Sequence, residues 1–126
     1  MTCKRVAPLV LLVLMFSAPA WAGEADVVDV RVRGQADGSY RFDATVRHGD
    51  EGWDHYADAF EIVGPDGAVL ATRVLAHPHV NEQPFTRSLG GVKIPQGVTS
   101  VEVRARDKVH GLGGKTLRVQ LPGRAE

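Results

Sequence analysis

Residues 40–48, with the sequence YRFDATVRH, decide the fold of this chain. Every second residue from Tyr40 to Val46 is aromatic or aliphatic, and the residues between them are polar or charged. Successive side chains of a β-strand point to opposite faces, so this pattern predicts a strand with one face in a hydrophobic core. Residues 101–107, VEVRARD, repeat the alternation. The chain therefore contains at least two strands that each bury one face.

Similar runs, separated by turns rich in Gly, Pro and Asp, extend along the chain. They predict seven strands at 27–33, 39–48, 56–63, 69–76, 85–89, 99–107 and 115–121. The first strand alternates Val28, Val30 and Val32 with charged residues. No segment after residue 23 carries the 3.6-residue apolar period of an amphipathic helix. The expected fold is all-β, an antiparallel immunoglobulin-like β-sandwich of about seven strands.

The first 22 residues have the composition of a secretory signal peptide. Lys4 and Arg5 precede an apolar run at 6–16, and Ala20-Trp21-Ala22 forms a small-x-small cleavage site before Gly23. The apolar run is roughly 11 residues, against the ~20 that span a membrane. We therefore expect a signal peptide at 1–22, a β-sandwich domain at 23–126, periplasmic or secreted localisation, and no membrane insertion after cleavage.

Composition excludes several classes of function. The chain of 126 residues has 15 Lys and Arg against 15 Asp and Glu, and Lys4 and Arg5 leave with the signal peptide. No basic patch of the kind that binds nucleic acid is expected in the remainder. The single cysteine, Cys3, is also removed, so the exported domain contains no disulfide although it enters an oxidising compartment.

The order of the predicted strands resembles immunoglobulin and fibronectin-III-like domains over nearly the whole exported chain. The resemblance implies the architecture alone, because the inter-sheet disulfide and the buried tryptophan of antibody domains are absent. The stretches at 53–58, WDHYAD, and 77–85, HPHVNEQPF, resemble small secreted bacterial proteins of unknown function.

Antiparallel topology predicts that all five histidines lie at one end of the sandwich. Consecutive antiparallel strands place alternate loops at opposite ends, and the histidines fall in or beside the loops near 48–56, 76–84 and 108–114. Carboxylates are expected at the same end, Asp50 and Asp107 among them. Imidazole and carboxylate together suit Cu(II), Zn(II) or Ni(II). The candidate metal ligands are His48, His55, His77, His79, Asp107 and His110.

Two further expectations concern how these residues lie. His77 and His79 are separated by one proline in an extended segment, so both rings should project to one side of an exposed loop. His48 and Asp107 continue the inward-facing alternation of their strands, so they should meet as a buried pair. Such a pair either closes the core by hydrogen bonding or forms one wall of a metal site, and the sequence leaves both open. Solvated loop histidines packed near Trp53 are the alternative to metal binding.

A second resemblance covers about a quarter of the chain. His48, His55-Tyr56 and Asp107-Lys108-Val109-His110-Gly111 are similar to the iron ligands of superoxide reductase domains, which use four histidines and a cysteine. Asp107 occupies the place of that cysteine. Without the thiolate, the resemblance implies a metal-binding end of the domain more than superoxide chemistry.

No catalytic nucleophile or acid–base pair can be assigned. Residues 111–116, GLGGKT, end like a phosphate-binding loop, but Val109 stands where the first glycine of that motif belongs and a strand follows instead of a helix. We therefore expect a binding protein with a divalent metal and not an enzyme. The rival is a structural or interaction module that docks onto an envelope partner without metal.

Overall fold

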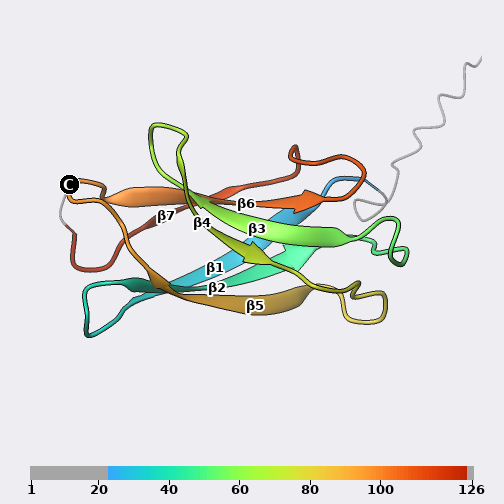
Figure 1. Cartoon of the computed structure of the whole chain (residues 1–126), viewed down its shortest axis with the longest axis horizontal. Coiled ribbons are helices and arrows are strands. Elements are labelled where there is room, and N and C mark those ends of the chain that lie inside the picture. The colour runs from blue at the N-terminus through green and yellow to red at the C-terminus, as the bar shows by residue number, and fades with distance from the viewer. Residues whose placement is uncertain (1–22, 125–126) are drawn as a thin grey trace, which may run out of the picture.

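The computed structural model describes residues 23–124 as two antiparallel sheets packed face to face (Figure 1). The predicted signal peptide at 1–22 lies outside the described residues. The strands are β1 (Asp26–Gly34), β2 (Tyr40–Arg47), β3 (Ala57–Val63), β4 (Val69–Val74), β5 (Phe85–Val92), β6 (Ser100–Asp107) and β7 (Leu117–Gln120). One sheet has the order β1-β2-β5 and the other β4-β3-β6-β7. The prediction of an all-β sandwich with seven strands is confirmed.

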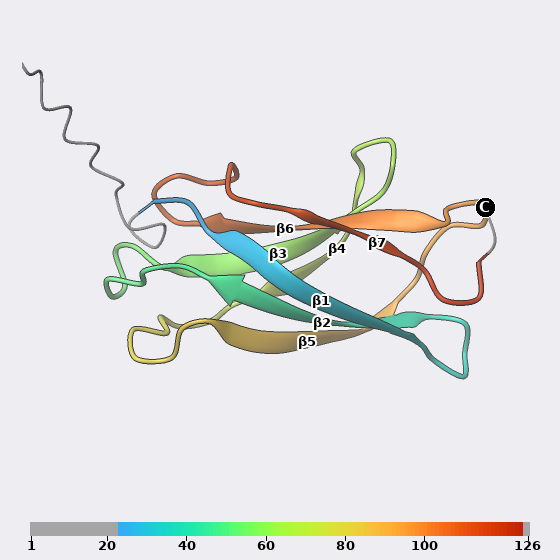
Figure 2. The same ribbon diagram turned by 180° about the vertical axis from the view of Figure 1, so that it is seen from behind.

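The core lies between the two layers, which Figure 2 shows from behind. Phe42 and Val46 of β2 meet Val103 of β6 there, and all three side chains are fully buried. Their polar neighbours along each strand face outward, as the period of two requires. His48 and Asp107 follow the same inward phase and are also 0% exposed.

Two details of the strands differ from the sequence prediction. The pairing of β1 with β2 shifts between Val27 and Asp29, so Val27 turns into the core and Val28 becomes 37% exposed. The expectation that Val28 faces inward is therefore wrong, because a β-bulge reverses the alternation locally. β5 also continues through Gly90 and Gly91 to Val92, beyond its predicted end at residue 89.

One end of the sandwich gathers the three loops that carry the histidines. The β2–β3, β4–β5 and β6–β7 loops lie together with the residues that precede β1, at the right of Figure 1. We call this the histidine end, made of residues 23–25, 48–56, 75–84 and 108–116. No helix in residues 23–124 is long and apolar enough to cross a membrane.

We expect Phe42→Ala and Val103→Ala each to destabilise the domain by about 2–5 kcal/mol, because each removes fully buried apolar volume. Arg31→Ala is the control, since the side chain of Arg31 is 83% exposed on β1 and should change stability by less than about 0.5 kcal/mol. Urea unfolding followed by tryptophan fluorescence measures all three. Losses below about 0.5 kcal/mol at both core positions would contradict the strand phase.

Candidate metal centre

Three side chains from separate segments meet at the histidine end. His48 follows β2 directly, His55 lies in the β2–β3 loop, and Asp107 is the last residue of β6. The Nε2 atoms of His48 and His55 are 3.2 Å apart, and Asp107 Oδ2 lies 3.2 Å from His48 Nε2 and 3.6 Å from His55 Nε2. His48 and Asp107 are fully buried, and the side chain of His55 is 12% exposed.

Strand register explains why these segments converge. Ala57 pairs with Asp107 between β3 and β6, which brings His55, two residues before Ala57, beside the end of β6. Lys108 N–H also donates to the carbonyl oxygen of Tyr56 at 3.1 Å. The inward phase of β2 brings His48 to the same point from the opposite sheet.

The triangle of donor atoms matches one face of a metal coordination tetrahedron. Zn–N and Zn–O bonds of about 2.0–2.2 Å place neighbouring tetrahedral ligands about 3.3–3.5 Å apart. The three observed separations of 3.2, 3.2 and 3.6 Å bracket this value. One ion can therefore contact all three atoms with only small movements of the side chains.

Asp50 orients His48 from the other side of its ring. His48 Nδ1 lies 2.6 Å from Asp50 Oδ1, which also accepts from the N–H of Ala57 at 3.0 Å. Asp50 Oδ2 accepts from the N–H of His79 at 2.6 Å. When Nδ1–H of a neutral histidine donates to a carboxylate, the Nε2 lone pair is directed at a metal, which is the usual outer arrangement of metal-binding histidines.

The carboxylate of Asp107 is held in place by its own loop. Oδ1 accepts from the N–H groups of Val109, at 2.8 Å, and of His110. Oδ2 lies 3.0 Å from Nδ1 of His110, so imidazole nitrogens of three histidines surround this one oxygen. Burial alone raises the pKa of Asp107, but these hydrogen bonds and the nearby His48 outweigh it, and the pKa is lowered. Asp107 therefore remains an anion available to a cation.

The pKa of His48 shows the strength of the surrounding negative charge. Burial lowers the pKa of this ring, yet the hydrogen bond to Asp50 and the charges of Asp50 and Asp107 raise it above its usual value overall. When His48 is protonated, Nε2–H has the carbonyl oxygen of Gly23 as an acceptor at 3.0 Å. A metal ion at the triangle competes with this proton for the same nitrogen.

Charge balance also favours a divalent cation. Asp50 and Asp107 are two fully buried carboxylates, and buried charge is costly unless it is compensated. A protonated His48 neutralises one of them. A divalent ion bound by neutral histidines neutralises both, without adding net charge to the interior.

His77 and His79 form a separate pair. Their ring centroids are 4.6 Å apart, but neither belongs to the group formed by His48, His55 and Asp107 among the described residues. His79 stacks on Phe85 at 4.0 Å between centroids and is only 6% exposed. The expectation that both histidines lie on an exposed loop is therefore wrong for His79, because the β4–β5 loop folds back over the core.

His79 is also poorly placed to bind an ion. Arg87 Nη2 donates to His79 Nε2 at 2.9 Å, so a guanidinium cation occupies the lone pair that a metal would need. Burial, then the charges of Arg87 and His77, lower the pKa of His79. The ring acts as a neutral packing element beneath the loop.

Sequence reasoning missed two groups that the structure adds to the site. The sequence predicted that Asp50 lies at this end of the sandwich, but it did not predict the hydrogen bond between Asp50 and His48 Nδ1. No sequence pattern indicates the role of the Gly23 carbonyl. It lies near His48 because Asp26 pairs with Arg47, which places residues 23–25 alongside His48. The spacing of Asp50, two residues after the inward-facing His48, is the sequence feature that could have indicated this hydrogen bond.

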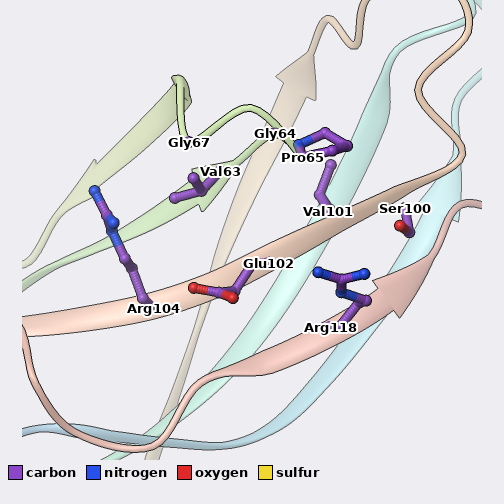
Figure 3. A pocket seen from close by; sticks show the side chains of 9 residues that line it. All are labelled: Val63, Gly64, Pro65, Gly67, Ser100, Val101, Glu102, Arg104 and Arg118. Atoms are coloured by element: carbon purple, nitrogen blue, oxygen red, sulfur yellow. The ribbon is translucent and has the colours of Figure 1, made fainter.

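A surface hollow lies away from the histidines, beside the β3–β4 turn. Its volume is about 170 Å³, and it is lined by Val63, Gly64, Pro65, Gly67, Ser100, Val101, Glu102, Arg104 and Arg118. Figure 3 shows the carboxylate of Glu102 between the two arginines. Arg104 Nε is already paired with Glu61 at 2.8 Å, so the charge of this arginine is compensated outside the hollow.

One known protein is similar in sequence to this chain, and its name states no activity. A protein from Halomicrobium mukohataei named "Putative lipoprotein" is 40% identical to this chain over 96 residues, 76% of this chain. The chain spans 47% of that protein, about half its length. No family model and no solved structure match the chain. The functional argument therefore rests on the geometry of the metal centre.

We expect the two histidines of the β4–β5 loop to differ in their effect on stability. His79→Ala should lower the melting temperature of the metal-free domain, because it removes a buried ring stacked on Phe85. His77→Ala should leave the melting temperature nearly unchanged, because His77 is exposed. Thermal unfolding by circular dichroism in the presence of a chelator compares them, and equal effects would contradict the buried position of His79.

The stability of the metal-free domain should also depend on pH through His79. The folded state resists protonation of this ring, whereas the unfolded chain binds a proton near its ordinary pKa of about 6.5. The contribution of neutral His79 is therefore present above about pH 6.5 and is lost as the pH falls. In His79→Gln, the free energy of unfolding should fall less steeply between pH 7.5 and 5 than in the native chain. Urea unfolding at several pH values tests this, and parallel curves would contradict it.

Proposed function

We propose that this protein binds one divalent transition metal ion through His48, His55 and Asp107. The observation that carries the proposal is the triangle of His48 Nε2, His55 Nε2 and Asp107 Oδ2, with sides of 3.2 to 3.6 Å. Each of the three ligand atoms already has a hydrogen-bond or ion-pair partner inside the site, and a metal ion would replace the proton that joins them. Asp50 and the N–H groups of residues 109 and 110 supply the outer support that metal ligands require.

Zn(II) fits this centre best among the candidate ions. Neighbouring ligands in a square-planar Cu(II) site are about 2.8 Å apart, closer than any side of the triangle, whereas a tetrahedral site matches all three. The mixed imidazole and carboxylate donors are suitable for Zn(II). Three protein side chains leave one tetrahedral position for a further ligand. His110 supports the centre by holding Asp107 Oδ2 through Nδ1 at 3.0 Å.

The location proposed for this binding activity is the cell envelope or the exterior. The relative from Halomicrobium mukohataei bears a lipoprotein name, which is consistent with an envelope or secreted protein. The N-terminal sequence, with its charged and apolar segments and small-x-small site, supports export and cleavage before Gly23. We propose a periplasmic or secreted metal-binding protein.

The test is metal-dependent stabilisation of untagged protein. Zn(II) at a hundredfold excess over the dissociation constant should add about 2.7 kcal/mol of stability and raise the melting temperature by roughly 10–20 °C. His55→Ala and Asp107→Asn should each abolish most of this rise, because each removes one ligand atom. His77→Ala is the matched control, since it removes a histidine from the same end of the sandwich without touching the triangle.

Calorimetry should give one Zn(II) per chain for the native protein and for His77→Ala. Elemental analysis after purification without added metal should detect a transition metal in near-equal amount to protein. Absence of binding by Zn(II), Cu(II) and Ni(II) at neutral pH would refute the proposal.

A second candidate function has its own observation. Trp53, Val80 and Val109 are 64%, 55% and 59% exposed, and they come from the three different loops of the histidine end. Large apolar side chains exposed on adjacent loops are typical of surfaces that contact other proteins. An interaction module of the envelope is the function that remains if no metal binds.

A further inference from the structure

The residues that precede β1 reach the metal centre and touch it through the backbone. The carbonyl oxygen of Gly23 lies 3.0 Å from His48 Nε2, the same nitrogen that forms one corner of the ligand triangle. Gly23 is also the residue that becomes the N-terminus if the signal peptide is cleaved after Ala22. Cleavage therefore creates a free α-amino group beside the proposed ion.

We propose that the processed N-terminus is itself a ligand: the α-amino nitrogen of Gly23, with the carbonyl oxygen of the same residue, completes the metal centre of His48, His55 and Asp107. The amino nitrogen and carbonyl oxygen of one residue close a five-membered chelate ring on a metal ion. The inference rests on the proposed metal-binding function. The amino nitrogen takes the position that the three side chains leave open, and the carbonyl oxygen adds a fifth contact, a coordination number that Zn(II) also adopts.

Close packing fixes the N-terminal segment in this position. Val27 N–H donates to the carbonyl of Lys115 at 2.8 Å, and Lys115 N–H donates to Asp26 Oδ1 at 2.7 Å. Ala25 is 1% exposed and belongs to the core. The segment that ends at Gly23 is therefore held against the β6–β7 loop and does not need to be ordered by the metal.

The glycines of the β6–β7 loop make this approach possible. A Cβ on Gly114 would overlap the backbone carbonyl of Ala25, and a Cβ on Gly113 would lie 2.7 Å from Oε1 of Glu24. The stretch at 111–116 that resembles part of a phosphate-binding loop in sequence thus has a different physical role. It allows the backbone of residues 24–25 to lie directly against the loop that carries Asp107 and His110.

The space beside Gly23 is open, since a Cβ there would meet no other atom within 4 Å. An amine with a pKa of about 7.7–8.0 loses its proton readily to a divalent cation near neutral pH. Processing of the precursor then becomes the step that completes the site.

The test compares two exported proteins that differ only ahead of Gly23. The full chain is secreted with its own leader, and its variant carries Ala-Ser inserted between Ala22 and Gly23, which moves the α-amino group two residues away. Intact mass identifies the N-terminus of each purified protein. The native protein should bind Zn(II) at least about tenfold more tightly than the extended one, because a direct ligand is lost. His77→Ala, which changes an exposed side chain outside the ligand triangle and the N-terminal segment, should bind as tightly as the native protein.

A spectroscopic readout separates ligation from a general effect of the extension. Cu(II) serves as the probe, and protein labelled with ¹⁵N-glycine reports by electron–nuclear double resonance whether a glycine nitrogen is bonded to the ion. The coupling of the bonded nitrogen should change on labelling in the native protein and not in the extended one. Equal Zn(II) affinity and no glycine coupling in either protein would overturn the inference while leaving the metal site intact. Failure of both proteins to bind metal would overturn the proposed function as well.

Discussion

The histidine end is organised around one ring, His48, held between two buried carboxylates. His48 Nδ1–H donates to Asp50 at 2.6 Å, and Asp107 faces Nε2 at 3.2 Å, with all three side chains fully excluded from solvent. Charges at such depth are tolerated only where partners compensate them. Every nearby loop contributes to that compensation: the β3 start through Ala57 N–H, the β4–β5 loop through His79 N–H, and the β6–β7 loop through residues 109 and 110.

The sandwich supplies the rigidity that this arrangement needs. His48 extends β2 and Asp107 ends β6, so the two partners come from opposite sheets and are fixed by the packing of Phe42 and Val103 beneath them. Gln83 links the β4–β5 loop to the end of β2. Its side chain accepts from His48 N–H at 3.0 Å and donates to the carbonyl of His79 at 2.9 Å. A site on strand ends supported in this way keeps its geometry without help from the ligand.

The histidines of this end fall into two groups. The ring nitrogens of His48 and His55 face each other and the Asp107 carboxylate, whereas His79 is occupied by Arg87 and packed on Phe85. The difference is electrostatic: two carboxylates surround the first pair, and a guanidinium faces the second. Side chains of one type at one end of a fold therefore lie in two different electrostatic environments.

The seven strands, the faces that they bury and the end at which the histidine loops gather follow from the amino-acid pattern. Period-two alternation fixes these features, because it specifies which side of a strand each residue occupies, and it placed His48 and Asp107 in the core. It misplaced Val28, since a bulge in β1 depends on pairing with β2. The folding of the loops brings His55 to His48 and Asp107, turns His79 away, and places Asp50 and the Gly23 carbonyl at the His48 ring. Loops have no repeating pattern to read, and their conformations are set by hydrogen bonds and close packing between segments that are distant in the chain.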